Sequence, residues 1–323
     1  MIHLSENPDL QYELTPNFEG RAWRTDVKIN SDGFRGNEFT RMDPSSYRIL
    51  VLGDSVAFGI SLPVEASFPY RTEELIRKEF PRFEVRNLSV VGYNTFQEVT
   101  LLERKGLEYH PNLVVIGYCL NDPMTFAFDL IYLRRLQEYS NNFLFRSRLM
   151  LFVARRLDRA HLTTFLQDQN DPGIFSRVYR NRIDPIGPEE KFLRRLIRSS
   201  ENTFPAVYYS HEAHVGLIRY AFRRLSELSV KNRFKVVIVI IPALEQRDGK
   251  YPYRNQHRIV QYEASRFNFD ILDTTDQFMK YGMDRLRMLR SDKIHPNEEG
   301  HRILAETLAS YIRTLPWKEK RPH

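Results

Sequence analysis

The chain has 323 residues, of which 42% are hydrophobic and 28% charged. It is long enough to bury a full core and ordinary enough in composition to be globular. A single cysteine excludes an internal disulfide and a zinc site built from cysteines. The N-terminus lacks the apolar core of a signal peptide, and no stretch reaches transmembrane length without charges. As written, the chain is predicted to be cytoplasmic, with the removal of a leader left open.

The net charge of +7 is concentrated in one part of the chain. Residues 131–200 hold 14 basic and 7 acidic residues, and the rest is close to balanced. A local basic surface predicts an anionic partner, either an anionic substrate or an acidic carrier protein. The alternative is a solvated helix face. Nucleic acid is not an expected partner, because only the net charge favours it.

The first 122 residues divide into an arm and a regular pattern. Residues 1–46 read as a loop-rich arm with a turn cluster at 30–36 and short strands at Tyr12–Pro16 and Val27–Asn30. Buried strands and helices then alternate. The expected order is strand 48–52, helix 65–80, strand 83–88, helix 96–107 and strand 113–117. This alternation predicts a parallel sheet covered by helices on both faces.

The alternation stops between residues 123 and 233, where the chain reads as helical and basic and is broken by Asp-Pro and Gly-Pro pairs. We expect a helical insertion that forms a lid or a pocket wall above the carboxyl edge of the sheet. A longer helix is predicted at 211–231. His211 and His214 in it lack the spacing of zinc proteases, since residue 215 is Val, and are expected on an ordinary helix surface.

The alternation resumes with a strongly apolar strand at 234–241. The remaining predicted elements are a helix at 254–267, a strand at 269–272 and a helix at 297–313. The predicted fold class is α/β: a three-layer α/β/α sandwich with a flavodoxin-like parallel sheet of about five strands. Residues 47–122 and 234–315 would form this core, with 123–233 as the insertion and 316–323 as a tail.

Polar residues follow several predicted strands at their carboxyl ends. They are Ser55, Gly92, Asn121, and the pair Asp292 and His295 before the last helix. Because the carboxyl ends of parallel strands share one edge of a sheet, these residues can converge although 240 positions separate the first from the last.

Their types suit nucleophilic catalysis. His295 can act as the base for the Ser55 hydroxyl, and Asp292, three residues away, can orient the imidazole. The Ser55 N–H, the Gly92 N–H and the Asn121 side-chain amide are candidate donors to an oxyanion. Taken singly, each residue is more simply read as a turn, cap or loop residue, and the order and spacing of the whole set favour the catalytic interpretation.

The set resembles the SGNH hydrolases, also called the GDSL family. Its blocks appear in order as Gly53-Asp-Ser55, Gly92, Asn121-Asp122 and Asp292-x-x-His295. Two positions depart from the family pattern. Val56 follows Ser55 where Leu is common, and Leu120 replaces a Gly before Asn121. Ala57 takes the place of the last glycine of a Gly-x-Ser-x-Gly elbow, which argues against an α/β-hydrolase.

Three polar neighbours of these blocks, Asp54, Asn94 and Asp122, are expected to support the loops by hydrogen bonding. Cys119 is expected to be a small core residue.

The resemblance implies a serine hydrolase that cleaves a carboxylic ester of a small molecule, lipid or carbohydrate through an acyl-enzyme on Ser55, without metal or cofactor. One alternative is an acyltransferase that uses the same triad to pass the acyl group to a sugar, an amine or a carrier-bound acceptor. A second is a non-catalytic binding module on the same scaffold.

Overall fold

The computed structural model describes residues 1–39, 45–123, 181–201 and 203–316, with Ser147, Met150 and Tyr179 as isolated positions. The helices expected between 124 and 178, which include most of the basic segment, lie outside the described residues. So does the tail from residue 317 onward. Within the described helices, none is long and apolar enough to cross a membrane.

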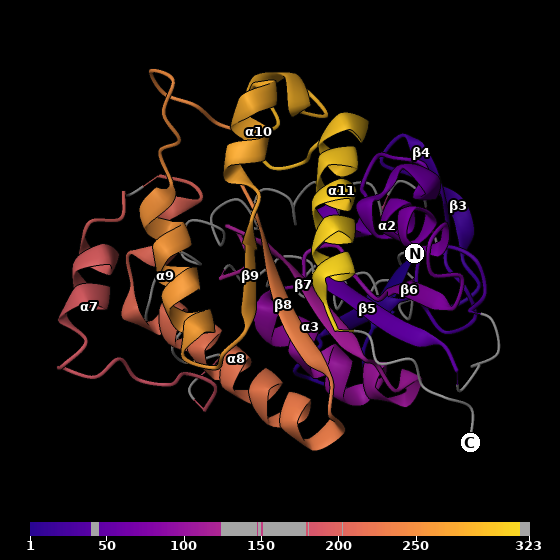
Figure 1. The fold of residues 1–323 in the computed structure, drawn as a ribbon, viewed down its shortest axis with the longest axis horizontal. Coiled ribbons are helices and arrows are strands. Elements are labelled where there is room, and N and C mark those ends of the chain that lie inside the picture. Colours follow the sequence, from indigo (N-terminus) through magenta and orange to yellow (C-terminus); the bar gives the residue numbers. More distant parts are fainter. Residues whose placement is uncertain are drawn as a thin grey trace.

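A five-stranded parallel sheet forms the centre of the molecule (Figure 1), with strands in the order β6-β5-β7-β8-β9. Its middle strands are unbroken apolar runs because both faces are covered. The strands are β5 (Tyr47–Gly53), β6 (Phe83–Asn87), β7 (Leu113–Cys119), β8 (Lys235–Ile241) and β9 (Asp270–Asp273). The predicted parallel sheet of about five strands is confirmed.

Helices form the two outer layers of the sandwich (Figure 1). Helix α11 (Glu298–Thr314) packs against α2 (Phe68–Arg77), while α3 (Thr95–Arg104) packs against α8 (Glu212–Asn232), which also contacts α9 (Arg254–Ser265). The short α10 (Thr275–Tyr281) follows β9. This order and layering are those of a flavodoxin-like α/β/α sandwich, as predicted.

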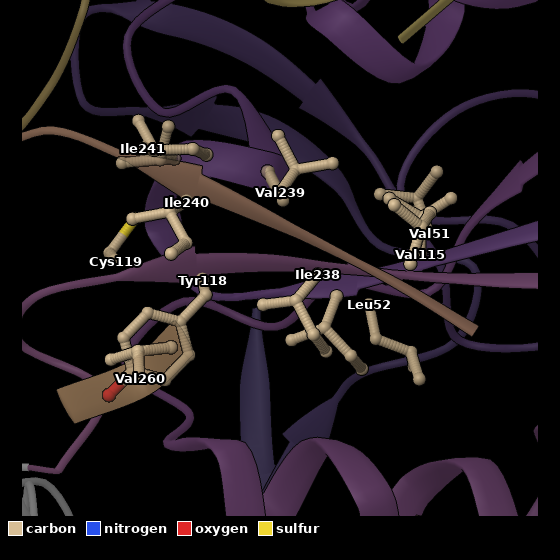
Figure 2. Packing of buried hydrophobic residues seen from close by; sticks show 14 of the residues in the cluster. Val51, Leu52, Val115, Tyr118, Cys119, Ile238, Val239, Ile240, Ile241 and Val260 are labelled. Atoms are coloured by element: carbon tan, nitrogen blue, oxygen red, sulfur yellow. The ribbon is translucent and has the colours of Figure 1, made fainter. Parts of the chain in front are cut away.

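The core lies between the sheet and its helices. Figure 2 shows that successive residues of β8 point to opposite sides: Val239 and Ile241 lie with Val51 and Val115, and Ile238 lies with Leu52 on the other side. All of these side chains are buried. The period-two alternation of a strand therefore supplies apolar surface to both helical layers.

The arm contains two small antiparallel hairpins. Strand β1 (Ile2–Leu4) pairs with β2 (Tyr12–Leu14), and β3 (Glu19–Ala22) pairs with β4 (Thr25–Lys28). The two strands expected in the arm correspond to β2 and β4. The turn cluster that follows contains a buried arginine, Arg35, which contacts the site described below.

Two helices of the expected insertion are described. Helix α7 (Lys191–Arg198) contacts α9, and α8 lies against α3 within a layer of the sandwich. His214 is buried on α8, so its expected place on a helix surface is wrong. Burial lowers the pKa of His214 to about 3. The boundaries drawn for arm, core, insertion and tail stay predictions.

One helix begins later than its sequence pattern indicates. The stretch expected as a single helix from residue 65 is a 3₁₀ turn, η1 (Val64–Ala66), followed by α2 from Phe68. Pro69 lies in the first turn of α2, where its missing N–H costs no intrahelical bond. His301 of α11 fixes this start, because its Nδ1 accepts the Phe68 N–H at 3.1 Å.

Candidate active site

Ser55 lies at the first position of α1 (Ser55–Phe58), directly after β5. The turn is tight because α1 lies close to the sheet. A Cβ on Gly53 would lie 2.6 Å from the Ala57 Cβ, and one on Gly117 would lie 3.3 Å from it. Gly53 and Gly117 are register partners on β5 and β7. Two glycines side by side therefore make the space into which α1 packs, and α1 presents Ser55 at the sheet edge.

The end of α1 is held by Arg35 from the arm. The Arg35 guanidinium donates from Nη1 to the carbonyls of Phe58 at 2.8 Å and Gly59 at 2.6 Å, and from Nη2 to that of Leu62. It also lies 4.8 Å from the centre of the Phe58 ring. These bonds satisfy carbonyls that a helix end leaves unpaired. Burial lowers the pKa of Arg35 to about 10, so it stays charged at neutral pH.

The other two members of the expected triad lie in the loop between η5 (Met283–Leu286) and α11. The His295 Nε2 is 2.8 Å from the Ser55 Oγ, and the His295 Nδ1 is 2.8 Å from the Asp292 Oδ2. The structure thus brings together all three side chains, which sequence spacing had only suggested.

A local turn fixes the geometry of Asp292. Its Oδ1 accepts the backbone N–H of Ile294 at 2.9 Å and of His295 at 3.0 Å. These two bonds fix the carboxylate relative to the backbone that carries the imidazole. Partial burial opposes ionisation. The hydrogen bonds from the His295 ring and from the two N–H groups outweigh it and hold the pKa of Asp292 at about 2. The ionised carboxylate accepts a hydrogen bond from the Nδ1–H of His295, and in that tautomer Nε2 is an acceptor for the Ser55 hydroxyl.

Gly92 lies in the turn after β6 and has a φ of 81°, a conformation that favours glycine. The turn lies against the nucleophile strand, because the Val90 N–H donates to the Gly53 carbonyl at 3.1 Å. Within the described residues the Gly92 N–H donates to no backbone carbonyl. The Ser55 N–H, at the first position of its helix, has no intrahelical acceptor.

Asn121 follows β7 and is 6% exposed. Its Nδ2 donates to the Asp54 Oδ2 at 2.8 Å, and the Asp54 Oδ1 accepts the Val56 N–H at 2.8 Å. Asp54 therefore both caps α1 and fixes the Asn121 amide, which keeps a second N–H for another acceptor. Leu120 is buried in the core.

The other two expected supporting residues take part in helix and loop contacts. Asn94 caps α3 through a capping box with Gln97, and its Nδ2 donates to the Tyr179 hydroxyl at 3.2 Å. Asp122 accepts the Thr95 hydroxyl at 3.0 Å. Thr95 is the first residue of α3, so both contacts join the loops after β6 and β7 to the start of one helix.

Sequence reasoning missed a buried acid beneath this edge, Glu98 of α3. It is 1% exposed, and neither of its carboxyl oxygens has a hydrogen-bond partner among the residues that the structure describes. Burial, together with the nearby Asp54, raises its pKa well above the usual range. Burial, together with Glu98 and Asp54, raises the pKa of Asp122. Burial also raises the pKa of the Cys119 thiol. The burial of Glu98 could have been predicted from its position on the core-facing side of an amphipathic helix.

No cluster of metal-ligating side chains was found within the described residues. The groups assembled at the sheet edge are a hydroxyl, an imidazole, carboxyls and amides, and they suit proton transfer and anion stabilisation.

Comparisons with solved structures and with protein families show what this chain is similar to. LAE5, an alpha/beta hydrolase from the metagenome of Lake Arreo in Spain, shares 13% identity over 84% of this chain and 98% of its own, with a TM-score of 0.47. An acetylxylan esterase, Axe2 from Geobacillus stearothermophilus, shares 13% identity over 86% and 98%, with a TM-score of 0.44. TesA shares 15% identity over 82% and 98%, with a TM-score of 0.43. No curated protein matches the chain.

The family comparison covers most of the sequence. Residues 51–303 match the GDSL-like Lipase/Acylhydrolase family. This interval begins in β5, just before Ser55, and ends inside α11, just after His295. The resemblance drawn from the four sequence blocks is confirmed, and the chain is an enzyme of the GDSL-like lipase/acylhydrolase family.

Proposed function

We propose that this protein is a serine esterase that cleaves a carboxylic ester through an acyl-enzyme on Ser55. Ester hydrolysis is the general chemistry of its family. The acyl-enzyme mechanism is supported by the continuous hydrogen-bonded chain from the Ser55 Oγ through both nitrogens of His295 to Asp292.

The proposed reaction has two steps. His295 Nε2 takes the proton of the Ser55 hydroxyl as Oγ attacks the ester carbonyl, and Asp292 stabilises the imidazolium that forms. The imidazolium then protonates the departing alkoxide, which leaves as an alcohol. Water, activated by His295, attacks the acyl-enzyme and releases the acid. The N–H groups of Ser55 and Gly92 and the remaining N–H of Asn121 are the proposed donors to the oxyanion.

The substrate proposed is an acyl or acetyl ester of a small molecule, lipid or carbohydrate. The solved structures with a similar fold include acetylxylan esterases, and for this chain a short acyl group is one case to test. A panel of short- and medium-chain nitrophenyl esters should be hydrolysed by the wild type. Ser55→Ala should lower turnover at least about a thousandfold. Unchanged turnover in the alanine variant would exclude Ser55 as the nucleophile.

A second candidate function, acyl transfer, is favoured by a basic face on α7. Lys191, Arg195 and Arg198 are exposed there at helical spacing, and none of them pairs with an acid within the described residues. Such a face fits an anionic acceptor or an acidic carrier protein. Supplying acidic carrier proteins and anionic sugars with an ester donor, and searching for acylated product by mass spectrometry, separates transfer from hydrolysis. Hydrolysis alone at every acceptor concentration would refute transfer.

A further inference from the structure

The molecule contains a second hydrogen-bonded Asp–His pair, away from Ser55. His257 of α9 is 3% exposed, and its Nδ1 lies 2.9 Å from the Oδ2 of Asp273 at the end of β9. Asp273 also accepts the Gln261 amide at 3.0 Å and both the hydroxyl and the N–H of Thr275. Burial opposes ionisation of Asp273, but these donors, His257 first among them, hold its pKa at about 2.

The direction of each hydrogen bond in this cluster follows from that carboxylate. An ionised carboxylate only accepts, so the His257 Nδ1 carries a hydrogen. In the tautomer with its one hydrogen on Nδ1, the ring accepts at Nε2. The group at Nε2 is the Tyr251 hydroxyl, at 2.9 Å. In this tautomer Tyr251 donates to His257, and its oxygen is left to accept. It accepts the Ala243 N–H at 3.1 Å.

The relay thus runs from a backbone N–H through a phenol and an imidazole to a buried carboxylate, with every bond pointing the same way. Its backbone end is the loop after β8, where Ala243 and Leu244 are both buried.

That loop is in turn bonded to the loop that carries His295. The Leu244 N–H donates to the Lys293 carbonyl at 2.6 Å, and the Leu244 carbonyl accepts Arg287 Nε at 2.8 Å and Nη2 at 2.6 Å. The Lys293 ammonium also pairs with Glu245 at 3.0 Å. Lys293 stands between Asp292 and His295, so the position of the loop after β8 sets the position of the imidazole.

We propose that Tyr251, His257 and Asp273 are positioning residues for His295. They fix the loop after β8, and this loop holds the backbone of the Asp292–His295 turn at the distance from Ser55 that proton transfer needs. The inference rests on the proposed serine-hydrolase function. It adds a second Asp–His pair that acts through the backbone and touches no substrate.

The test uses Tyr251→Phe, which keeps the aromatic ring and removes only the hydroxyl. The matched control is Tyr262→Phe, on the same helix as His257, where the lost hydroxyl donates to Glu190 at 3.1 Å instead. For nitrophenyl acetate, Tyr251→Phe should lower kcat about tenfold with KM within about twofold of the wild type, because a small misplacement of a reacting group is costly. Tyr262→Phe should leave both constants unchanged.

A second readout does not depend on turnover. A proton shared between His295 Nδ1 and Asp292 should give a downfield NMR resonance, identified by its loss in Asp292→Asn. Tyr251→Phe should shift this resonance or speed its exchange with solvent, and Tyr262→Phe should do neither.

The outcomes are distinct. A lowered Tm with kcat and the resonance both unchanged in Tyr251→Phe would overturn the proposal, because the relay would then be structural only. Equal effects in Tyr262→Phe would overturn it as well. If Ser55→Ala keeps full turnover, the proposed function fails, and the resonance alone then decides whether the relay positions His295.

Discussion

The Arg35 clamp on α1 leads to a quantitative prediction about stability. Arg35 is 4% exposed and donates to two backbone carbonyls at the end of the helix that begins with Ser55 and to a third, that of Leu62, in the loop after it. Arg35→Met keeps most of the aliphatic stem and removes every donor. The carbonyls of Phe58, Gly59 and Leu62 then lose their charged partner in the protein interior.

The magnitude follows from two opposing effects. A hydrogen bond from a charged donor contributes about 1.5–3 kcal/mol, so three of them set an upper bound of several kcal/mol. Burial of the guanidinium costs part of this, as its lowered pKa shows. We expect Arg35→Met to lower the free energy of unfolding by about 3 kcal/mol.

Urea unfolding, followed by circular dichroism, measures this change. The control is Arg77→Met on the exposed side of α2, where the one ion pair of the arginine within the described part of the chain is with Glu73 at 3.7 Å. It should cost less than about 0.5 kcal/mol. A loss below about 1 kcal/mol for Arg35→Met, or one no larger than that of the control, would refute the idea that Arg35 holds α1.

Two further predictions concern the sheet edge. Asn121→Ala should lower kcat for nitrophenyl acetate about a hundredfold with little change in KM, since an oxyanion donor acts mainly in the transition state; an unchanged kcat would remove Asn121 from the site. Glu98→Gln concerns pH. Burial raises the pKa of Glu98 in the folded state, so the wild type should lose stability as pH rises above the ordinary Glu value of 4.5. The Gln variant has no carboxyl to ionise and should not show this loss. If the free energy of unfolding of the wild type and of the Gln variant changes equally between about pH 5 and about pH 8, burial does not raise the pKa of Glu98.

Some of the fold could be predicted from the sequence because its signals are local. The apolar runs that became β5, β7 and β8 are unambiguous, and their order fixes a parallel sheet. That in turn predicts that Ser55 and His295 meet at one edge, although only the structure gives their 2.8 Å separation.

Other features depend on contacts that no local pattern carries. Arg35 and Glu98 are charged residues, and charge is normally a sign of exposure. Arg35 is buried because it bonds the carbonyls at the C-terminal end of α1, and Glu98 is buried because α3 packs under the site. His214 was misplaced for the same reason: a histidine in a polar helical stretch gives no sign of which neighbour will cover it. The relay from Ala243 to Asp273 likewise involves three separate elements.

The separation of Ser55 from His295 along the chain has a consequence for how activity arises during folding. The two residues are 240 positions apart, and the histidine loop is anchored by α11, whose His301 accepts a hydrogen bond from the first residue of α2. Contacts of such long range slow folding, because the entropy of closing the loop is lost before the contacts stabilise the fold. Catalysis therefore depends on the docking of the last helix onto an early one, so the recovery of turnover during refolding should lag behind the recovery of helical signal. Turnover therefore reports that the whole chain has folded, whereas the helical signal reports only local structure.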